Sequence, residues 1–376
     1  MIVDSVDAIA RLDVARWNAL AGSQPFIGHG FLAALEQSGA VGGKSGWMPC
    51  HLALRQDDHL LGAMPLYLKS HSYGEYVFDW SWADAYQRAG GAYYPKLVCA
   101  VPFTPVPGPR LLADSLSNAE RLLDGAVALA ERQALSSIHL LFPEPVADAA
   151  LRERGWLCRE GVQFHWHNAG YRDFADFLAA LSHDKRKKIR QERRRLAEAG
   201  VEVVRRQGAA ITAEDWAFFY RCYVTTYLTH RSTPYLSLDF FERLGTTLPE
   251  SCLLILAYQN GRPIAAALDI DDGTRLYGRY WGAEVYVPNL HFELCYYQGI
   301  EHAIARGLAV FEGGAQGEHK LARGFTPVRT RSFHWLADPV FRLAVERFLQ
   351  REERGVTHYL SELDERLPFR HEPLEI

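Results

Sequence analysis

The chain has 376 residues, a length that suits two domains of roughly 150–200 residues better than one hydrophobic core. Hydrophobic residues make up 48% of it and aromatic residues 12%, which is enough to fill two cores and excludes a disordered chain. The formal net charge of −4 argues against a general nucleic-acid-binding protein, because such proteins are usually basic overall.

No targeting or membrane segment is expected. The stretch from Met1 to Asp7 lacks the basic start and apolar run of a signal peptide, and no window approaches 18 uninterrupted apolar residues. The six cysteines are far apart and form no Cys-x-x-Cys pair, so we expect reduced core residues. His165 and His167 alternate on a predicted strand, which is too little for a metal site, and we assign none. The sequence predicts a cytoplasmic protein without stable membrane insertion.

In the first half, hydrophobic periodicity predicts three helices and four strands. The helices are expected at Val14–Ala21, Gly30–Ser38 and Ser117–Gln133. The strands are expected at Met48–Gln56, Leu60–Lys69, Ser137–Phe142 and Gln163–His167. The segment from Tyr73 to Arg110 is dense in Trp, Tyr, Pro and Gly, and we expect it to be irregular but not flexible.

The second half has stronger signals of the same kinds. Helices are predicted at Phe174–Leu181, Asp184–Ala199, Glu214–Thr229, Leu238–Leu248, His291–Arg306 and Pro339–Arg354. Strands are predicted at Val201–Arg206, Cys252–Tyr258, Pro263–Asp271, Arg275–Trp281, Ala309–Glu312 and Thr330–Leu336. Asn260-Gly261 and Asp272-Gly273 are hairpin-turn pairs, so three of these strands are expected to form a meander.

The two halves share one order of elements. The segment Ala53–Met64 can be laid over Leu256–Ala267, and the helix-to-strand passage Val127–Phe142 matches Ile300–Phe311. This repeat predicts two tandem α/β domains, residues 1–165 and 166–376, with mixed, largely antiparallel central sheets. The order is similar to that of the GNAT acyltransferases, whose splayed central strands admit a pantetheine arm. The alternative is a pair of unrelated α/β domains.

The strongest local feature is a basic helix. Eight of the eleven residues from Lys185 to Arg195 are Lys or Arg, and like charges at helical spacing repel one another. We interpret the helix as a docking surface for the phosphates of coenzyme A, a tRNA or an anionic lipid. The residues expected to bind the donor here are Lys185, Arg186, Lys188, Arg190 and Arg193. The alternative is a solvated helix face paired with acidic residues elsewhere.

A second feature is the glycine-rich segment from Glu312 to Phe325. It follows a predicted buried strand and holds five functional side chains within eight residues, namely Gln316, Glu318, His319, Lys320 and Arg323. Ligands often bind where the strands of an α/β sheet end, and glycines allow a close approach of backbone to substrate. No phosphate-binding P-loop pattern is present. An ordinary surface loop is the alternative.

Two further regions are candidates. The predicted helix start at Asn289 and His291 offers free backbone N–H groups to a pyrophosphate, and His291 or Glu293 is a candidate base. Glu293 alone is as well explained as a complement to the helix dipole. In the first half, the rigid aromatic segments Tyr76–Tyr86 and Pro102–Arg110 are expected either to line an acceptor groove or to pack a long crossover.

These segments carry a resemblance that covers nearly the whole chain. The chain resembles the FemAB-like branch of the GNAT superfamily, the peptidoglycan biosynthesis/recognition proteins. The sequence motifs that carry this resemblance are Tyr94-Pro-Lys-Leu, Pro102-Phe-Thr-Pro, Gly161–Trp166 and above all Gly314–Phe325. Fem transferases carry a Phe-Lys-x-Gly-Phe-Gly motif, and His319–Phe325 looks like its counterpart, without the second glycine. The resemblance implies that Lys320 stabilises negative charge on a tetrahedral intermediate or holds a substrate phosphate.

The sequence departs from its relatives at two places. It lacks the long helical-hairpin arm that many aminoacyl-tRNA-dependent Fem enzymes carry, and it lacks the Gln/Arg-x-x-Gly-x-Gly/Ala pyrophosphate signature of ordinary GNAT enzymes. Neither donor is therefore marked by its usual motif.

The expected activity is N-acyl transfer from acyl-CoA to a primary amine by direct attack within a ternary complex. The amine belongs to a small molecule or a cell-wall precursor. Lys320 and Arg323 would stabilise developing charge, and Glu312, Glu318 or His319 would act as the base. No cysteine or serine stands in a nucleophile setting, so no covalent intermediate is expected. Two alternatives remain: aminoacyl-tRNA as the donor, or a non-catalytic module that binds cell-wall or lipid precursors.

Overall fold

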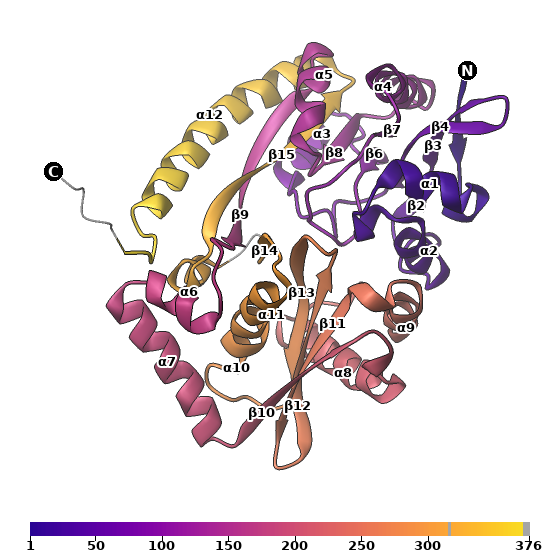
Figure 1. The fold of residues 1–376 in the computed structure, drawn as a ribbon. Coiled ribbons are helices and arrows are strands. Elements are labelled where there is room, and N and C mark those ends of the chain that lie inside the picture. The colour runs from indigo at the N-terminus through magenta and orange to yellow at the C-terminus, as the bar shows by residue number, and fades with distance from the viewer. Residues whose placement is uncertain (315–316, 371–376) are drawn as a thin grey trace. The chain divides into compact units, whose positions relative to one another are not determined.

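Figure 1 shows the computed structural model of the chain, which describes residues 1–314 and 317–370. The chain forms two compact units. The first unit contains Met1–Gly161 and Arg329–Thr357, and the second contains Val162–Val328 and the residues from His358 onward. Two long strands, β9 (Leu157–His167) and β15 (Thr326–Leu336), pass from one unit into the other.

The first unit is built on antiparallel strands with one parallel pair. Its strands are β1 (Ile2–Val6), β2 (Trp47–Pro49), β3 (His51–Gln56), β4 (His59–Met64), β5 (Leu66–Lys69), β6 (Lys96–Cys99), β7 (Leu112–Ala113) and β8 (Ser137–Leu141). Strands β1, β3 and β4 pair in antiparallel fashion, as do β2, β5 and β6, while β6 and β8 are parallel. Only one residue separates β2 from β3, and only one separates β4 from β5. Each of these two pairs therefore forms one bent strand that passes from one set of paired strands to the other.

Helices cover the sheet of the first unit. They are α1 (Val14–Ala21), α2 (His29–Gln37), α3 (Trp80–Arg88), α4 (Leu116–Arg132), α5 (Asp148–Glu153) and most of α12 (Pro339–Asp364). Helix α4 buries Leu122, Ala126 and Leu129, which recur at three- and four-residue spacing, in a core that contains Leu52 and Ile138. Ser115 caps this helix by accepting a hydrogen bond from the backbone N–H of Asn118.

The second unit contains one meander and a parallel strand beside it. Its strands are β10 (Val201–Gln207), β11 (Cys252–Gln259), β12 (Arg262–Asp271), β13 (Arg275–Ala283) and β14 (Val310–Glu312). Strands β10 to β13 are antiparallel neighbours in chain order, and β14 runs parallel to β13. The turn between β11 and β12 has positive φ at both Asn260 and Gly261, as the sequence predicted for a tight hairpin.

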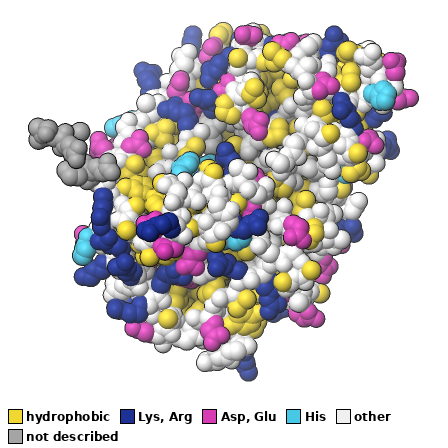
Figure 2. All heavy atoms as spheres, viewed as in Figure 1, with side chains coloured by type: hydrophobic (Ala, Val, Ile, Leu, Met, Phe, Trp, Pro, Cys, Tyr) yellow, Lys and Arg dark blue, Asp and Glu magenta, His cyan; other side chains and the backbone are white. Residues whose placement is uncertain are grey.

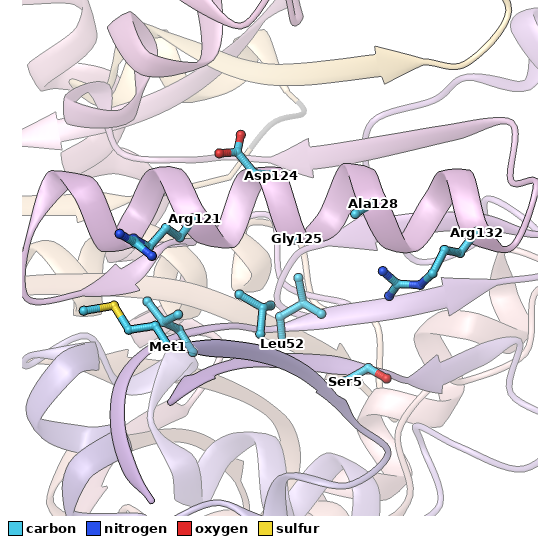
Figure 3. A pocket seen from close by; sticks show the side chains of 10 residues that line it. Met1, Ser5, Leu52, Arg121, Asp124, Gly125, Ala128 and Arg132 are labelled. Carbon is cyan, nitrogen blue, oxygen red and sulfur yellow. The ribbon is translucent and has the colours of Figure 1, made fainter. Parts of the chain in front are cut away.

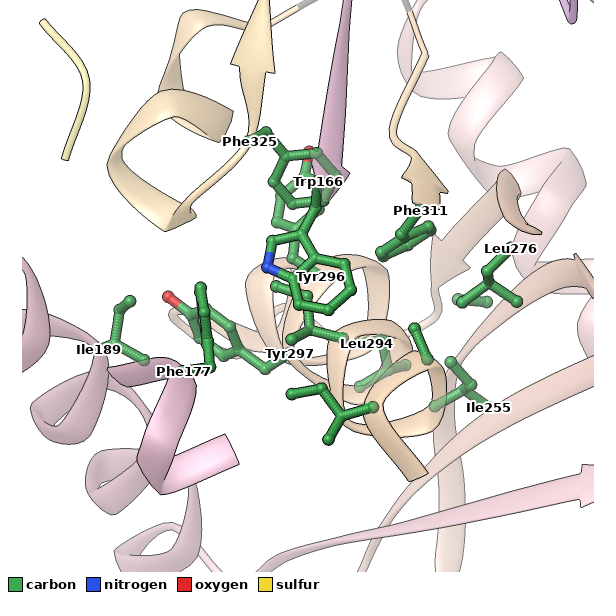
Figure 4. Packing of buried hydrophobic residues seen from close by; sticks show 14 of the residues in the cluster. Trp166, Phe177, Ile189, Ile255, Leu276, Leu294, Tyr296, Tyr297, Phe311 and Phe325 are labelled. Carbon is green, nitrogen blue, oxygen red and sulfur yellow. The ribbon is translucent and has the colours of Figure 1, made fainter. Parts of the chain in front are cut away.

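The helices of the second unit are α6 (Phe174–Ala180), α7 (His183–Glu198), α8 (Ala213–Thr229), α9 (Leu238–Thr247), α10 (Leu290–Phe292) and α11 (Gln298–Arg306). Figure 4 shows the core, in which Trp166, Phe177, Leu294 and Phe311 converge from different elements. Helix α7 contributes Ile189 and Leu196, which lie on one face of the helix, to this core.

The two units repeat one arrangement. In each, an antiparallel run ends in a strand that pairs in parallel with the strand following a helix: β6, α4 and β8 in the first unit, and β13, α11 and β14 in the second. Each parallel pair then receives an antiparallel strand from a distant part of the chain, because β15 pairs with β8 and β9 pairs with β14. The predicted fold class, α/β with two GNAT-like units and mixed, largely antiparallel sheets, is confirmed.

Several predicted elements differ from those observed. The segment from Tyr73 to Arg110 was expected to be irregular, yet it contains α3 and the fully buried strand β6, so that prediction was wrong. The turn-forming residues lie around these two elements, and β6 is too short to give a periodic signal. The predicted helix His291–Arg306 is interrupted, because Glu293–Tyr297 forms a π-helical turn between α10 and α11. The closing helix extends beyond Arg354 to Asp364.

Two further features concern membranes and thiols. Among residues 1–314 and 317–370, no helix combines the length and apolar character needed to cross a bilayer. All six cysteines are free thiols.

Gly282 tests the packing of α8 against β13. A Cβ atom built on Gly282 would lie 1.9 Å from the backbone oxygen of Cys222 in α8, so Gly282→Ala forces the helix away from the strand. We expect the free energy of unfolding to fall by about 3 kcal/mol, as is typical of overpacking.

Gly355→Ala is the matched control, because Gly355 lies on an exposed part of α12 with open space around it. This control is expected to gain about 0.5–1 kcal/mol from helix propensity. Urea unfolding measures the free energy of unfolding of both variants. Equal changes in the two would contradict the close packing of α8 against β13.

Candidate active site

A small cavity opens where β13 and β14 part. The two strands pair only over Arg275–Tyr277 and Val310–Glu312, after which β13 continues alone to Ala283. The cavity measures about 150 Å³ and we call it the slot. It is lined by Ala267, Asp269, Gly278, Arg279, Tyr280, Trp281, His291, Cys295, Tyr296, Gly313 and Lys320.

Irregular backbone shapes the walls of the slot. The pairing of β12 with β13 shifts register beside Asp269, so that Arg279 is an extra residue in β13. On the other wall, a Cβ atom on Gly313 would lie 2.8 Å from the ring of Phe325 and 3.1 Å from the backbone oxygen of Phe164. Glycine is therefore required where the chain leaves β14.

Lys320 projects into the slot from a short 3-10 helix, Glu318–Arg323. Its side chain is buried, and its Nζ donates a hydrogen bond to the backbone oxygen of Gly314 at 3.3 Å. The Nζ atom also lies 5.8 Å from the centre of the Phe164 ring. Burial lowers the pKa of Lys320 to about 8. The amine is mainly protonated at neutral pH and is poised to stabilise a developing negative charge.

Arg323 has a different position. Its guanidinium is buried, forms an ion pair with Glu192 of α7 at 3.0 and 3.2 Å, and lies 3.4 Å from the centre of the Phe292 ring. Glu192 also accepts a hydrogen bond from the hydroxyl of Tyr297. Arg323 does not line the slot but joins the segment that carries Lys320 to α7.

Two histidines lie beside Lys320. His291 lines the slot, and His319 contacts it through Tyr296, whose hydroxyl oxygen lies 2.9 Å from Nε2 of His319. The centres of the two imidazole rings are 6.0 Å apart. Burial and the neighbouring positive charges lower the pKa of both, that of His291 to about 4, so both rings are neutral at neutral pH.

The two glutamates predicted as bases lie outside the slot lining. Glu312 is buried, with Arg275 2.9 Å away, and burial raises its pKa to about 7 against the opposing effect of Arg275. Glu318 is held on the other side of its helix by Arg366 at 2.8 Å and by the hydroxyl of Tyr359 at 3.0 Å. Gln316 lies outside the described residues.

Helix α7 presents two different faces. Arg193, one of its predicted donor-binding residues, bonds to Glu293 at 2.9 and 3.0 Å and to Glu301, and therefore braces the π-helical turn. The remaining basic side chains have no acidic partner within 4 Å among residues 1–314 and 317–370: Lys185, Arg186, Lys187, Lys188, Arg190 and Arg195. Figure 2 shows basic side chains gathered over this helix. The alternative of a face paired with acidic residues therefore holds for Arg193 and Arg194, which pairs with Glu198, but not for the other six cations among the described residues.

Asn289 has a left-handed backbone, with φ of 70°, and begins the turn into α10. Its side chain is not among those that line the slot, whereas His291, two residues later, is.

Most of the slot residues were not candidates from the sequence, and three of them carry functional groups that bear on the chemistry: Asp269, Cys295 and Tyr296. Asp269 lies on β12 and is 2% exposed, and burial raises its pKa well above the usual range. The signal for it was an acid within the apolar run Ile264–Ile270, where ionisable residues are rare. Cys295 and Tyr296 both reach the slot because they belong to the π-helical turn, a distortion that is frequent at functional sites and carries no sequence signature.

The corresponding place in the first unit is filled. Where β6 and β8 end, the buried guanidinium of Arg110 donates hydrogen bonds to the backbone oxygens of Leu141 at 2.8 Å and Val106 at 2.6 Å. A separate cavity of about 310 Å³ lies in the first unit between α4 and strands β1 and β3 (Figure 3). Its charged residues, Arg121, Asp124 and Arg132, are exposed on α4, and it contains no buried ionisable group. The slot is the better candidate for chemistry.

The ion pair between Arg323 and Glu192 gives a stability test. Glu192→Ala leaves a buried guanidinium without its carboxylate, which typically costs about 3–5 kcal/mol. Glu198→Ala on the same helix is the control, because Glu198 and Arg194 form an exposed pair worth less than about 1 kcal/mol. Chemical unfolding measures both, and similar losses would show that α7 does not brace the Lys320 segment.

Solved structures share the fold of the chain, and one family model matches its sequence. The chain has the fold of a solved FemX structure, with 14% identity over 89% of this chain and 98% of that one and a TM-score of 0.55. It also has the fold of the C-terminal domain of a putative lysylphosphatidylglycerol synthetase from Agrobacterium fabrum, at 10% identity, 90% and 96% coverage and a TM-score of 0.53. None of the curated proteins compared with the chain matches it. The profile of the FemAB-like family, described as peptidoglycan biosynthesis/recognition, matches residues 8–371, and the chain belongs to this family.

Proposed function

We propose that the chain is an N-acyltransferase and that its active site is the slot of the second unit. The observation that carries the proposal is the buried ammonium of Lys320 in a cavity between two parting strands. An amine that attacks an acyl carbonyl produces a tetrahedral intermediate with negative charge on oxygen. A cation fixed in a water-poor cavity stabilises that charge more strongly than water does.

The first unit supports this assignment by contrast. Arg110 fills the place where β6 and β8 part, with its guanidinium committed to backbone carbonyls. Only the second unit offers both a cavity and a cation at this position in the described residues. The predicted role of the first unit, acceptor binding or support, remains part of the proposal.

The donor proposed is acyl-CoA. A slot of about 150 Å³ is smaller than the roughly 300–1,000 Å³ of sites that enclose a whole ligand, so it suits the reacting group alone. The phosphates would then bind outside it, on Lys185, Arg186, Lys188 and Arg190 of α7. Aminoacyl-tRNA is the second candidate donor, favoured by the same set of unpaired cations and by the family to which the chain belongs.

The acceptor proposed is a primary amine of a peptidoglycan precursor, in keeping with the description of the family. The reaction is proposed for the cytoplasm, where both candidate donors are made. No covalent enzyme intermediate is needed, because burial raises the pKa of Cys295, the thiol that lines the slot, well above its usual range.

Native mass spectrometry of the freshly purified chain separates the two donors. Retained coenzyme A supports acyl-CoA, and retained RNA supports aminoacyl-tRNA. Transfer of radiolabel from each donor to a peptidoglycan precursor fraction then tests turnover. Absence of transfer from either donor would contradict the proposal and favour a non-catalytic binding module.

Lys320→Ala is the decisive variant. We expect it to lose about 100-fold or more of kcat, comparable to removal of an oxyanion-stabilising donor, with little change in melting temperature. Lys44→Ala, on an exposed loop of the first unit, is the control and keeps full activity. Because the pKa of Lys320 is about 8 and the charged form is the active one, the rate should fall as pH rises through 8. Lys320→Arg should move that fall to higher pH.

Replacement of the four α7 cations tests the donor surface. The variant Lys185→Gln, Arg186→Gln, Lys188→Gln and Arg190→Gln should raise KM for the donor about tenfold or more at low salt, with kcat unchanged. Added salt should reduce the difference between this variant and the wild type. Arg262→Gln, which removes one exposed cation from the β11–β12 hairpin, is the control. An unchanged KM would remove α7 from the donor site.

A further inference from the structure

Asp269 is the one side chain of the slot whose presence has no structural explanation. It projects from the middle of β12, is 2% exposed and lines the cavity. Among the described residues, no donor forms a hydrogen bond with its Oδ2 atom. A buried carboxyl group without a partner is destabilising, since it has lost its hydration and gained nothing in return.

Asp271 shows how a structural acid is held in the same strand. It lies two residues further along β12 and therefore on the same face of the sheet. Its carboxylate is 2.9 Å from Nε2 of His302 and 3.5 Å from Nε of Arg306, and it accepts a hydrogen bond from the backbone N–H of Gly273. These partners hold the pKa of Asp271 below its usual value, whereas burial alone raises that of Asp269.

Helix α11 approaches Asp269 without offering it a partner. A Cβ atom on Gly299 would lie 3.3 Å from Oδ2 of Asp269 and 2.5 Å from the ring of Phe311, so only glycine fits between them. The helix thus covers the carboxyl group and excludes water from one side. The other side faces the slot.

Besides the cations Lys320 and Arg279, the slot is lined by residues suited to a small amine. Ala267 and Gly278 leave room beside the carboxyl group, and the rings of Tyr280, Trp281 and Tyr296 form the walls. Aromatic rings and a carboxylate together favour an ammonium group, because the ring faces carry negative potential. A cavity of about 150 Å³ has room for an amine and a few carbon atoms.

We propose that Asp269 binds the primary amine of the acceptor and accepts its proton during acyl transfer. This inference rests on the proposed function and names the base within the same site. The amine nitrogen attacks the acyl carbon, and its lone pair forms the C–N bond. The bond from that carbon to the donor's leaving atom then breaks. The bound ammonium first gives one proton to the Asp269 carboxylate, which frees the lone pair for this attack. The second proton, lost from nitrogen after the C–N bond has formed, passes to the leaving atom of the donor. Asp269 then returns its proton to solvent, so that charge and atoms balance.

Asp269 is better placed for this role than the predicted bases. Glu312 and Glu318 are engaged with Arg275 and Arg366 outside the slot lining. His319 is already bonded through Nε2 to Tyr296. The Oδ2 atom of Asp269, by contrast, has no hydrogen-bond partner among the described residues, and the side chain lines the slot.

Binding of simple amines tests the inference without the donor. Propylammonium chloride should raise the melting temperature of the wild-type chain, whereas 1-propanol at the same concentration should not. Asp269→Asn should abolish the propylammonium effect and retain the fold. Asp271→Asn is the matched control, because it makes the same chemical change on the same face of the same strand. This variant should keep the propylammonium effect. A response that survives in Asp269→Asn would overturn the inference.

Stability against pH separates a functional acid from a structural one. The pKa of Asp269 is raised in the folded state, so its carboxyl leaves the stability of the fold unaffected below about pH 4, where it is protonated both folded and unfolded. As pH rises above about 4, the wild type loses stability through this carboxyl group, and Asp269→Asn does not. The melting temperature of Asp269→Asn should therefore equal or exceed that of the wild type near pH 7, by a margin that shrinks toward pH 4. Asp271→Asn should be less stable than the wild type at pH 7. A destabilised Asp269→Asn would mean a structural acid.

Turnover completes the test. Asp269→Asn should reduce kcat/KM about 100-fold or more, the usual contribution of a general base. Normal turnover in Asp269→Asn together with an inactive Lys320→Ala would refute this inference and leave the proposed function intact. Loss of amine binding in Asp269→Asn without turnover in the wild type would refute the proposed function and retain the amine site.

Discussion

The parallel pairing of β13 with β14 lasts for three residue pairs, and the site depends on where it stops. A parallel strand bonds evenly along its neighbour, so a cavity between two such strands requires that one of them leave. β14 ends at Glu312 and turns away through Gly313, while β13 continues past a bulge at Arg279. The slot and the positions of Lys320 and Asp269 in its lining all follow from that separation.

Helix α7 stabilises one wall of the slot and leaves its own charge available. On its buried face, Glu192 holds Arg323 and Tyr297, and Arg193 holds Glu293. These bonds fix the two segments that carry Lys320 and Tyr296. Arg194 forms an exposed pair with Glu198, and six further cations of the helix have no acidic partner within 4 Å among the described residues. A helix that only braced the core would need the buried face alone, so the unpaired cations require a separate explanation, and the proposed binding of donor phosphates is one.

Much of the second unit could be predicted from its sequence, because its signals are local. Hairpin turns such as Asn260-Gly261 and amphipathic helices such as α9 depend on residues close together in the chain. The Lys320 segment was also identified from sequence, by its density of functional side chains after a buried strand. Its neighbours Glu318 and Arg323 carried the same signal, and only the fold distinguishes them from Lys320, since their partners Arg366 and Glu192 are distant in the chain. Asp269 was missed for the opposite reason, because one acid in an apolar strand gives no pattern until the cavity beside it is known.

The contrast between the two units explains why the slot is not simply a consequence of the fold. Both units contain a parallel strand pair that ends early, yet in the first unit Arg110 donates to the carbonyls left at that point. Those bonds satisfy backbone groups that would otherwise be buried without partners. In the second unit the same kind of place keeps the buried carboxyl of Asp269, whose Oδ2 accepts no hydrogen bond from the described residues, an arrangement that stability alone does not favour. A destabilising group retained in a cavity beside a buried cation is typical of a site selected for binding and chemistry.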